Sequence, residues 1–479
     1  MKLKELLYGY DVKSEFDDVE ISGICYDSRK IKKGDVFVCI TGFAADGHIY
    51  ANAAVSGGAS AIIAERDLGL SVPTAVVDNS RHALSFIADR FYDHPSGKFK
   101  LIGVTGTNGK TTTTFLVKKI LEDAGLKVGL IGTNKNMIGD VDIPTERTTP
   151  ESLELTQLFA QMADEAVDCV VMEVSSHSLC LSRVEFCEFD VGAFTNLTQD
   201  HLDFHETMEN YLAAKKKLFD MCKTGIINAD DEGGRQILAD CSCVSVSYGI
   251  DSATDIKASN IEFGADGVDF DCDSLGAVSH MHINTPGRFS VYNALAAVGI
   301  CTALGVSADV IKKGLGDLNG VCGRAEIVPV NRDYTVMIDY AHTPDGIENI
   351  LSSIRGFAKG RIVILFGCGG DRDKTKRPKM GKIAGKLADF CIVTSDNPRT
   401  ENPTEIINEI IPGVEEAGGK YTVIENRKEA IRYALKNAQK DDVILLAGKG
   451  HETYQILAEG KIHFDEREVV REILEDEQL

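Results

Sequence analysis

A segment rich in glycine and threonine, GVTGTNGKTTTT at 103–114, has the residue types that hold phosphate. Gly106 and Gly109 permit close backbone approach to oxygen atoms, Lys110 supplies positive charge, and the Thr111 hydroxyl is a suitable Mg²⁺ ligand. The strict pattern has glycine at the position of Val104, so the match is partial. A strand-like run precedes the segment and a helix-like run follows it. This context favours a phosphate-binding loop over an ordinary turn.

Two further polar segments are candidates for a metal site. Glu173 ends the apolar run DCVVMEV (168–174), where a buried carboxylate needs a cation or a charged partner. With a phosphate loop in the same sheet, we interpret Glu173 as a magnesium ligand. A second segment, 196–219, carries Asp200, His201, Asp203 and His205. It lacks a thiolate and matches no common zinc spacing, so zinc binding and a solvated polar loop both remain open.

The elements that must position these residues follow from the apolar runs. Runs without alternation at 100–106, 127–132 and 168–174 predict parallel strands covered on both faces. Helices are expected at 80–95, 110–125 and 287–305, and the alternating pattern of 235–285 predicts an antiparallel region. From about 326, strand-like runs alternate with helical stretches, which predicts an open doubly wound sheet. Four polar clusters follow these strands, at 339–345, 367–378, 395–401 and 447–452, where ligands bind in such sheets.

Composition limits the class of protein. The 479 residues are too many for one ordinary core, and we predict three domains: 1–98, 99–325 and 326–479. The formal net charge of −22 argues against a nucleic-acid partner, because phosphate backbones are bound through basic surfaces. No apolar run reaches about 18 residues, and the start MKLKELLYGY does not read as a secretory signal. We therefore expect a cytoplasmic protein without a membrane partner. The thirteen cysteines form no Cys-x-x-Cys pair and most lie in apolar runs, which favours reduced thiols. As a separate expectation, the protein is a monomer.

Beyond single motifs, an ordered set of segments resembles a known family. TGTNGKTTT, MEVSSHSL, TNLTQDHLDFH, YLAAKKKLF, GRFSVYNALAA, GRAE and IDYAHTPD occur in the order seen in Mur ligases. These are ATP-dependent amino-acid-adding enzymes of peptidoglycan synthesis. YDSR near the start, with GGDRDKTKRP, DNPR and GKGHE in the last block, is most similar to the members that add the third residue of the stem peptide. The resemblance implies an α/β fold with a smaller N-terminal domain for the UDP end of the substrate. It also implies a central ATP-binding domain with a mostly parallel sheet and a C-terminal Rossmann-like domain.

The resemblance also implies roles for single residues around ATP and Mg²⁺. The predicted ATP-binding positions are Gly106, Thr107, Asn108, Gly109, Lys110, Thr111, Thr112, Asn293, Arg324 and Asp339. The predicted magnesium ligands are Thr111, Glu173, His201 and Lys215, with Lys215 carried as a carbamate in the family. The residues expected to act in catalysis are Lys110, Lys215, His201, Glu173 and Arg324.

Two substrates are implied, UDP-N-acetylmuramoyl-L-alanyl-D-glutamate and meso-diaminopimelate. The first is expected to contact Ser28, Thr41, Gly42, Thr148, Thr149, Ser175 and Arg183. Leu181 stands where some members have glutamine, so one hydrogen bond of that set is missing here. The diamino acid is expected to contact Arg372, Asp396, Asn397, Pro398, Arg399, Gly448 and Glu452. Arg399 provides the counter-charge for the second carboxylate of diaminopimelate, which lysine lacks.

Three other interpretations compete with this one. Folylpolyglutamate synthase shares the central-domain plan, but YDSR and DNPR argue against it. A Mur ligase of another step is a nearer rival. A nucleotide-dependent switch or kinase would use the phosphate loop alone, and the polar clusters of the last block favour a ligase over it.

Overall fold

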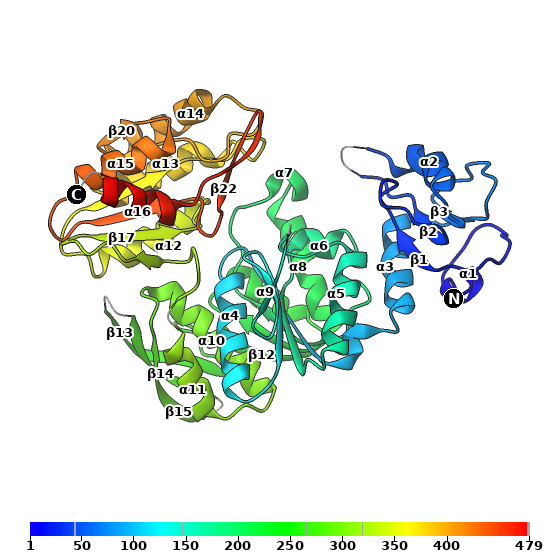
Figure 1. The fold of residues 1–479 in the computed structure, drawn as a ribbon. Helices are drawn as coiled ribbons and strands as arrows, with labels where there is room; N and C mark the ends of the chain where they lie inside the picture. The colour runs from blue at the N-terminus through cyan, green and yellow to red at the C-terminus, as the bar shows by residue number, and fades with distance from the viewer. Residues whose placement is uncertain (43–44, 146, 265–266, 275, 319, 477–479) are drawn as a thin grey trace. The chain divides into compact units, whose positions relative to one another are not determined.

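The computed structural model describes residues 1–42, 45–145, 147–264, 267–274, 276–318 and 320–476 (Figure 1). These residues form two compact units. The first comprises Met1–Thr105, Leu126–Gly192 and Ala214–Thr224. The second comprises Gly106–Gly125, Ala193–Ala213 and the chain from Gly225 onwards. This division into compact units does not test the two domain boundaries expected from the sequence, at 98/99 and 325/326, which stay a prediction.

The N-terminal part of the first unit is a small α/β layer structure. Its four strands are all parallel in the order β1-β2-β3-β4. They are β1 (Gly23–Cys25), β2 (Asp35–Val38), β3 (Ala61–Ala64) and β4 (Thr74–Val76). One face packs on α1 (Leu3–Leu6) and α3 (Ser80–Phe91), and the other on α2 (Ala51–Ser56). Successive strand residues therefore enter different cores, since side chains alternate across a strand.

The central sheet has eleven strands in the order β15-β14-β13-β12-β11-β10-β5-β9-β6-β7-β8. In the first unit, β5 (Lys100–Thr105) and β6 (Val128–Ile131) both pair in parallel with β9 (Cys169–Glu173), as the apolar runs predict. Antiparallel strands β7 (Asn136–Ile138) and β8 (Val141–Ile143) extend the edge. Two helices also lie wholly in this unit, α5 (Ser152–Asp164) and α6 (Ser176–Cys180). Three elements include residues of both units: β10 (Phe189–Phe194), α8 (Met208–Met221) and β11 (Cys222–Asn228).

In the second unit, the expected antiparallel region is confirmed for three strands. β13 (Ile256–Phe263), β14 (Val268–Ser274) and β15 (Ala277–Ile283) pair antiparallel, whereas β12 (Val244–Gly249) pairs with β13 in parallel. The predicted helices are also present: α4 (Lys110–Asp123) ends before Gly125, whose φ of 86° suits a helix terminus. The other helices are α7 (Leu202–His205), α9 (Glu232–Asp240), α10 (Arg288–Ala303) and α11 (Ala308–Asp317).

The C-terminal sheet is the predicted doubly wound sheet, with the order β16-β17-β21-β18-β19-β20. All its pairings are parallel except that of β16 (Glu326–Val328). The parallel strands are β17 (Thr335–Asp339), β18 (Ile362–Phe366), β19 (Phe390–Val393), β20 (Tyr421–Val423) and β21 (Val443–Ala447).

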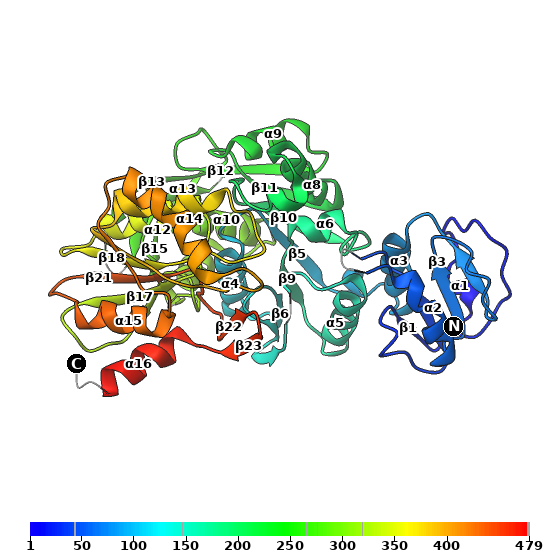
Figure 2. The same cartoon turned by 90° about the horizontal axis from the view of Figure 1, so that it is seen from above.

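Helices cover both faces of this sheet. Figure 2 shows α12 (Pro344–Arg355), α13 (Lys376–Leu387) and α14 (Pro403–Glu416) on one side. On the other side lie α15 (Arg427–Lys436) and α16 (Glu466–Asp476), which pack on a separate core. A hairpin of β22 (Tyr454–Leu457) and β23 (Gly460–His463) follows β21. Among the described residues, no helix is both long and apolar enough to span a bilayer.

Candidate active site

The phosphate-loop candidate begins directly after β5 and ends in the first turn of α4. Gly106 has φ of 147° and Gly109, the residue preceding α4, has φ of 86°. A Cβ atom on Gly106 would overlap Oγ1 of Thr195, and one on Gly109 would overlap Oδ1 of Asn293. Both positions therefore require glycine, in backbone geometry and in space. The contact also brings Asn293 to the loop, a position for which residue pattern alone predicted no role.

Side chains of the loop turn inward and hold its shape. The Lys110 ammonium donates to the carbonyl oxygens of Gly106 at 2.9 Å and Thr107 at 2.8 Å. Thr107 Oγ1 lies 3.2 Å from the Tyr211 hydroxyl, and the amide of Asn108 donates to Asn196. The ammonium group is thereby fixed beside the start of α4, and a cation next to a helix N-terminus is an anion-binding arrangement.

A neighbouring segment, Thr195–Thr198, supports this loop from outside. Thr195 Oγ1 donates to the carbonyl oxygen of Asn108 at 2.6 Å, and the amide of Thr198 donates to Thr107 Oγ1 at 3.0 Å. Asn196 accepts the amide of Thr107 through its carbonyl oxygen at 2.9 Å. TNLT begins one of the segments that resemble the Mur ligases, but the sequence predicted no role for these four residues. Its place at the end of the apolar strand β10 was the available signal.

Arg324 also reaches the loop, within the second unit. Its Nη2 donates to Thr111 Oγ1 at 2.9 Å, and its guanidinium carbon lies 4.8 Å from the centre of the Tyr340 ring. Its buried Nε has no hydrogen-bond partner among the described residues. A buried guanidinium donor without a partner is costly, and a phosphate oxygen would satisfy it. The residues present therefore fit a nucleotide phosphate.

Asp339 lies at the end of β17, one residue before Tyr340. Its two carboxylate oxygens accept the amides of Ala325 and Ala341, each at 2.7 Å. Burial raises the pKa of this carboxyl, although the nearby Arg324 charge and the two amides act against the rise. The arrangement connects the segment that carries Arg324 to β17 of the C-terminal sheet.

The histidine-containing segment forms a polar cluster in the second unit. His201 has φ of 54°, and its amide donates to Asp200 Oδ1 at 2.9 Å. Burial opposes ionisation of Asp200, but the charges of His201, His342 and Lys376 outweigh it and lower its pKa to about 2. Among the described residues, no three His, Cys, Asp or Glu side chains gather as a metal site. A metal site that includes His201 would therefore need ligands of other residue types as well.

In the first unit, the predicted metal ligand Glu173 is 1% exposed at the end of β9. Its carboxylate accepts the amide of Thr133 at 2.8 Å and the Thr133 hydroxyl at 2.9 Å. Thr133 in turn lies 3.0 Å from the hydroxyl of Thr148. Thr133 was missed by sequence reasoning, because nothing in its local pattern marks it. Lys215, on α8, is also 1% exposed, which is unusual for a lysine.

Three of the predicted substrate residues gather beside Glu173. Thr149 Oγ1 donates to the Glu173 carbonyl oxygen at 2.9 Å and accepts the amide of Ser175 at 3.1 Å. Arg183 donates to the carbonyl oxygen of Thr149 at 3.1 Å and pairs with Glu151 at 3.3 Å. Glu151, 7% exposed, was another residue that sequence reasoning missed. These contacts connect the residues that follow β9 with the residues that precede α5.

The predicted UDP-contacting residues follow strands of the N-terminal sheet. Ser28 is half-buried after β1, and Thr41 is exposed after β2. Thr41 Oγ1 donates to Glu65 at 3.1 Å, and Glu65 also accepts the amide and hydroxyl of Ser80. Gly42 donates its amide to Ala45 at 2.9 Å. Because these strands are parallel, Ser28 and Thr41–Gly42 belong to the same edge of the sheet.

The DNPR segment and the GKGHE segment meet at the edge of the C-terminal sheet. Asn397 donates to Glu452 at 2.8 Å, and its Oδ1 accepts from the Lys449 ammonium at 3.2 Å. Lys449 also donates to Glu452 at 2.9 Å and is fully buried. A Cβ atom on Gly448, whose φ is 112°, would lie 2.5 Å from Asp396 Oδ2. Lys449 had no predicted role, although a lysine between two glycines after an apolar strand was visible.

Charges around Asp396 make this edge strongly polar. Asp396 is 7% exposed, and the Arg427 guanidinium lies 3.9 Å from it. Burial disfavours its charge, but Lys449 and Arg427 outweigh that effect and hold its pKa below the ordinary value. Arg427 is itself fully buried and pairs with Glu466 at 2.8 Å. The DNPR segment thus rests on a buried ion network.

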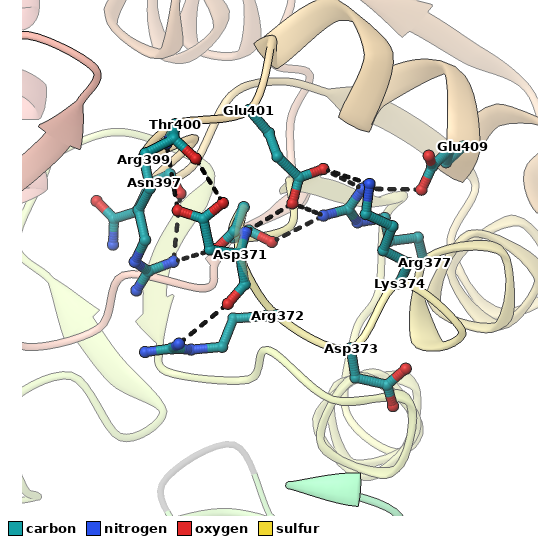
Figure 3. Close-up of polar contacts among 12 residues, drawn as sticks. Asp371, Arg372, Asp373, Lys374, Arg377, Asn397, Arg399, Thr400, Glu401 and Glu409 are labelled. Atoms are coloured by element: carbon teal, nitrogen blue, oxygen red, sulfur yellow. Dashed lines mark hydrogen bonds and ion pairs between the residues drawn. The ribbon is translucent and has the colours of Figure 1, made fainter. Parts of the chain in front are cut away.

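Two arginines complete the polar group at this edge of the sheet. Arg399 Nη1 donates to the carbonyl oxygen of Gly370 at 2.8 Å, and Arg372 Nη1 donates to that of Asp371 at 3.0 Å. In Figure 3 the guanidinium groups of Arg372 and Arg399 extend to the same side of the two loops that carry them. Pro398, between Asn397 and Arg399, is buried. The predicted amino-acid residues of this domain are therefore brought to one edge, with two cations facing one side.

Comparison with known proteins agrees with this architecture. Three family models match: the Mur ligase family catalytic domain at 20–92, the Mur ligase middle domain at 104–301, and the Mur ligase glutamate ligase domain at 323–450. The UDP-N-acetylmuramoyl-L-alanyl-D-glutamate–2,6-diaminopimelate ligase of Caldanaerobacter subterraneus is 50% identical, over 99% of each chain. Ligase 1 of that name from Clostridium acetobutylicum is 50% identical, over 99% of this chain and all of the relative.

A solved structure of a UDP-N-acetylmuramoyl-L-alanyl-D-glutamate–2,6-diaminopimelate ligase is 28% identical to this chain in sequence. It superposes with a TM-score of 0.70 and covers 100% of this chain and 99% of its own. The match extends over the whole chain and includes all three parts of the architecture. This chain therefore belongs to the Mur ligase family.

Proposed function

We propose that this ligase joins meso-diaminopimelate to the side-chain carboxylate of D-glutamate in UDP-N-acetylmuramoyl-L-alanyl-D-glutamate, at the expense of ATP. The observation that carries the proposal is the charge pattern at the C-terminal sheet edge. Two arginines, Arg372 and Arg399, face one side, and the carboxylates of Asp396 and Glu452 lie at the same edge of the sheet. A diamino acid with two carboxylates and two ammonium groups is the matching ligand. The names of the relatives at 50% identity support the same substrate pair.

The chemistry needs activation of a carboxylate, because its oxygen is a poor leaving group. Transfer of the γ-phosphoryl group of ATP to a carboxylate oxygen gives ADP and an acyl phosphate. The diamino acid's free amine then attacks the acyl carbon, and the tetrahedral intermediate expels phosphate as the amide forms. The amine loses one proton in this step. Two anions meet during phosphoryl transfer, so fixed cations must offset their repulsion.

In this proposal, Lys110 and Arg324 are the fixed cations. Lys110 is held by two loop carbonyls, and Arg324 is held by Thr111 and the Tyr340 ring. Neither side chain has to be ordered when the nucleotide binds, which reduces the cost of charge stabilisation. The other loop residues, Gly106 to Thr112, would bind phosphate oxygens through backbone N–H groups. Asn293 and Asp339 would contact the adenine and the ribose.

Mg²⁺ would be held by Thr111, Glu173, His201 and Lys215, and it would supply further neutralisation of the phosphates. Glu173 is suited to this because Thr133 fixes its buried carboxylate. Lys215 is suited only as a carbamate, since an ammonium cannot ligate a cation. Carbamylation by CO₂ converts it into an anionic oxygen donor, which also explains a lysine with 1% exposure.

Lys215→Ala tests this role. Activity should fall strongly, and added short carboxylates should partly restore it by entering the vacated space. Lys216→Ala is the matched control, because its neighbouring side chain is half-buried on the same helix and has no proposed role. Full activity of the Lys215 variant would remove the lysine from the mechanism.

The acceptor substrate would lie along Ser28, Thr41 and Gly42 for its UDP part. Thr148, Thr149, Ser175 and Arg183 would contact its sugar-peptide part. The clustering of the last four beside Glu173 in the first unit supports a common ligand. Arg183 is the cation of this set and suits a carboxylate of the peptide.

Phosphate release from purified protein tests the reaction as a whole. ATP, the UDP-dipeptide and each of meso-diaminopimelate and L-lysine are combined, and each component is omitted in turn. Release should require all three components and should be much faster with diaminopimelate. Release without an amino acid would indicate a simple ATPase or a switch. Oxygen-18 placed in the acceptor carboxylate should appear in the liberated phosphate, and its absence there would exclude the acyl phosphate.

A further inference from the structure

A buried ion pair joins the two loops that carry Arg372 and Arg399. Arg377, in the first turn of α13, is 1% exposed. Its Nη1 and Nη2 bind the two oxygens of Glu401 at 3.0 and 2.9 Å, which is the two-pronged geometry that favours arginine over lysine. Glu401 lies two residues after Arg399, and Arg377 lies five residues after Arg372. The pair therefore connects the loop after β18 to the loop after β19.

Glu401 extends this connection beyond Arg377. Its Oε1 also accepts the amide of Asp371 at 2.6 Å, and the Lys374 ammonium lies 2.9 Å from Oε2 (Figure 3). The Arg377 bonds lower the pKa of Glu401 to about 2, so the carboxylate is ionised at neutral pH. One carboxylate from the second loop thus holds three groups of the first loop and its following helix.

Further contacts set the spacing of the two loops. The Thr400 hydroxyl donates to Asp371 Oδ1 at 2.7 Å, and the Gly370 amide donates to the Asn397 carbonyl oxygen at 2.9 Å. A Cβ atom on Gly370 would overlap the carbonyl oxygen of Pro398, so the two backbones are in direct contact. The position of Arg399 depends on this spacing, because its guanidinium is bonded to the carbonyl oxygen of Gly370.

In each of the two loops, one residue has an unfavourable backbone conformation. In the first loop it is the residue before the arginine, and in the second it is the arginine itself. Asp371, directly before Arg372, has φ of 55°, and Arg399 itself has φ of 53°. For residues other than glycine, this left-handed region costs about 1 kcal/mol or more and persists only when surrounding contacts enforce it. The Arg377–Glu401 pair and the Asp371–Thr400 bond are the contacts that enforce it here.

We propose that Arg377 and Glu401 are positioning residues that hold Arg372 and Arg399 at the spacing of the two carboxylates of the diamino acid. This inference rests on the proposed function, because it assumes that both arginines bind that substrate. Neither Arg377 nor Glu401 has to touch the amino acid. They set where the two cations stand before it binds.

The test uses Arg377→Lys and Glu401→Gln in the full-length protein. Arg377→Lys keeps the charge and loses the two-pronged geometry, while Glu401→Gln keeps the shape and loses the charge. Each should raise KM for meso-diaminopimelate by about tenfold or more, as misplacement of substrate-binding groups does. KM for ATP and for the UDP-dipeptide should not change. If Arg377→Lys fails to fold, the half-buried Glu401→Gln decides the question.

Matched controls come from the same two helices. Glu409→Gln removes another bond to Arg377, at 2.8 Å, but Glu409 lies on α14 outside both loops. Lys382→Met breaks an exposed ion pair with Glu416 between α13 and α14. Both controls should leave KM for diaminopimelate unchanged. Conversely, if the Glu401 variant raised all three KM values and lowered the melting temperature together, the pair would be purely structural and the inference wrong.

Arg399→Ala in the same assay separates this inference from the proposed function. If Arg399→Ala leaves KM for diaminopimelate unchanged, the proposed amino-acid site is wrong. If Arg399→Ala raises that KM and neither Arg377→Lys nor Glu401→Gln does, the site stands and the positioning role alone is refuted.

Discussion

Replacing Arg399 by alanine should change which amino acid this ligase prefers. The bonds that described residues make to its guanidinium use Nη1, toward Gly370 and Asn397 at 2.8 and 3.4 Å. These bonds orient the group and leave the edge of Nε and Nη2 for a carboxylate. Two charge-assisted hydrogen bonds contribute about 1.5–3 kcal/mol each. Water partly replaces these bonds in the variant, so we expect a net loss of about 3 kcal/mol in the free energy of diaminopimelate binding. This loss corresponds to a roughly 100-fold higher KM.

Steady-state phosphate release with meso-diaminopimelate and with L-lysine measures the effect. KM for diaminopimelate should rise about 100-fold with little change in kcat, since the bond is present before and during reaction. Lysine has no second carboxylate, so its KM should change little and the preference should fall by the same factor. Arg355→Ala, an exposed arginine of α12 paired with Asp389, is the control and should change neither. An equal loss with both amino acids would refute the assigned contact.

Three further changes have defined outcomes. Gly106→Ala should destabilise the protein by at least about 2 kcal/mol and weaken ATP binding, because the new methyl overlaps Thr195 in a backbone region that alanine avoids; thermal unfolding and KM for ATP measure this. Glu173→Gln keeps the shape and one acceptor oxygen for Thr133 but removes the charge, so kcat should fall about 100-fold and the Mg²⁺ requirement should rise in a magnesium titration. The pKa of Glu401 is depressed to about 2, so the stability it contributes is present above about 4.5 and is lost as pH falls toward about 2; the difference in free energy of unfolding between the wild type and Glu401→Gln should shrink across that window.

Much of the architecture was predictable because buried parallel strands leave a simple signal. The apolar runs that became β17, β18, β19 and β21 are short and uninterrupted, and each ends in a polar cluster. Parallel strands bring their carboxyl ends to one edge, so the meeting of these clusters follows from the pattern alone. The contact of Asn397 with Glu452, 55 residues further along the chain, is the outcome.

Residues whose contact partners are distant in the sequence were harder to predict. Thr133 holds Glu173 across 40 residues of sequence, and Thr195 holds Asn108 across 87. A lone threonine after a strand has no periodicity, charge or motif that indicates its partner. The residue pattern alone gave no sign that Asn293 lies beside Gly109, because an amide within an apolar helix resembles any other buried polar residue, and only the family resemblance indicated a role for it. Such residues become visible only when the fold brings the partners together.

The placement of cations explains how a protein with a net charge of −22 can be built to bind anions. Its surface repels ATP and acidic sugar-peptides at long range, so attraction must come from a few fixed groups. Lys110 is fixed by backbone carbonyls that cannot titrate, and Arg399 is fixed in the same way. Arg377 and Lys449 are instead paired with half-buried carboxylates, and their task is to hold other groups. At the amino-acid site, an arginine bound to carbonyl oxygens keeps its full charge for a ligand, whereas an arginine paired with a carboxylate does not, and this difference separates Arg399 from Arg377.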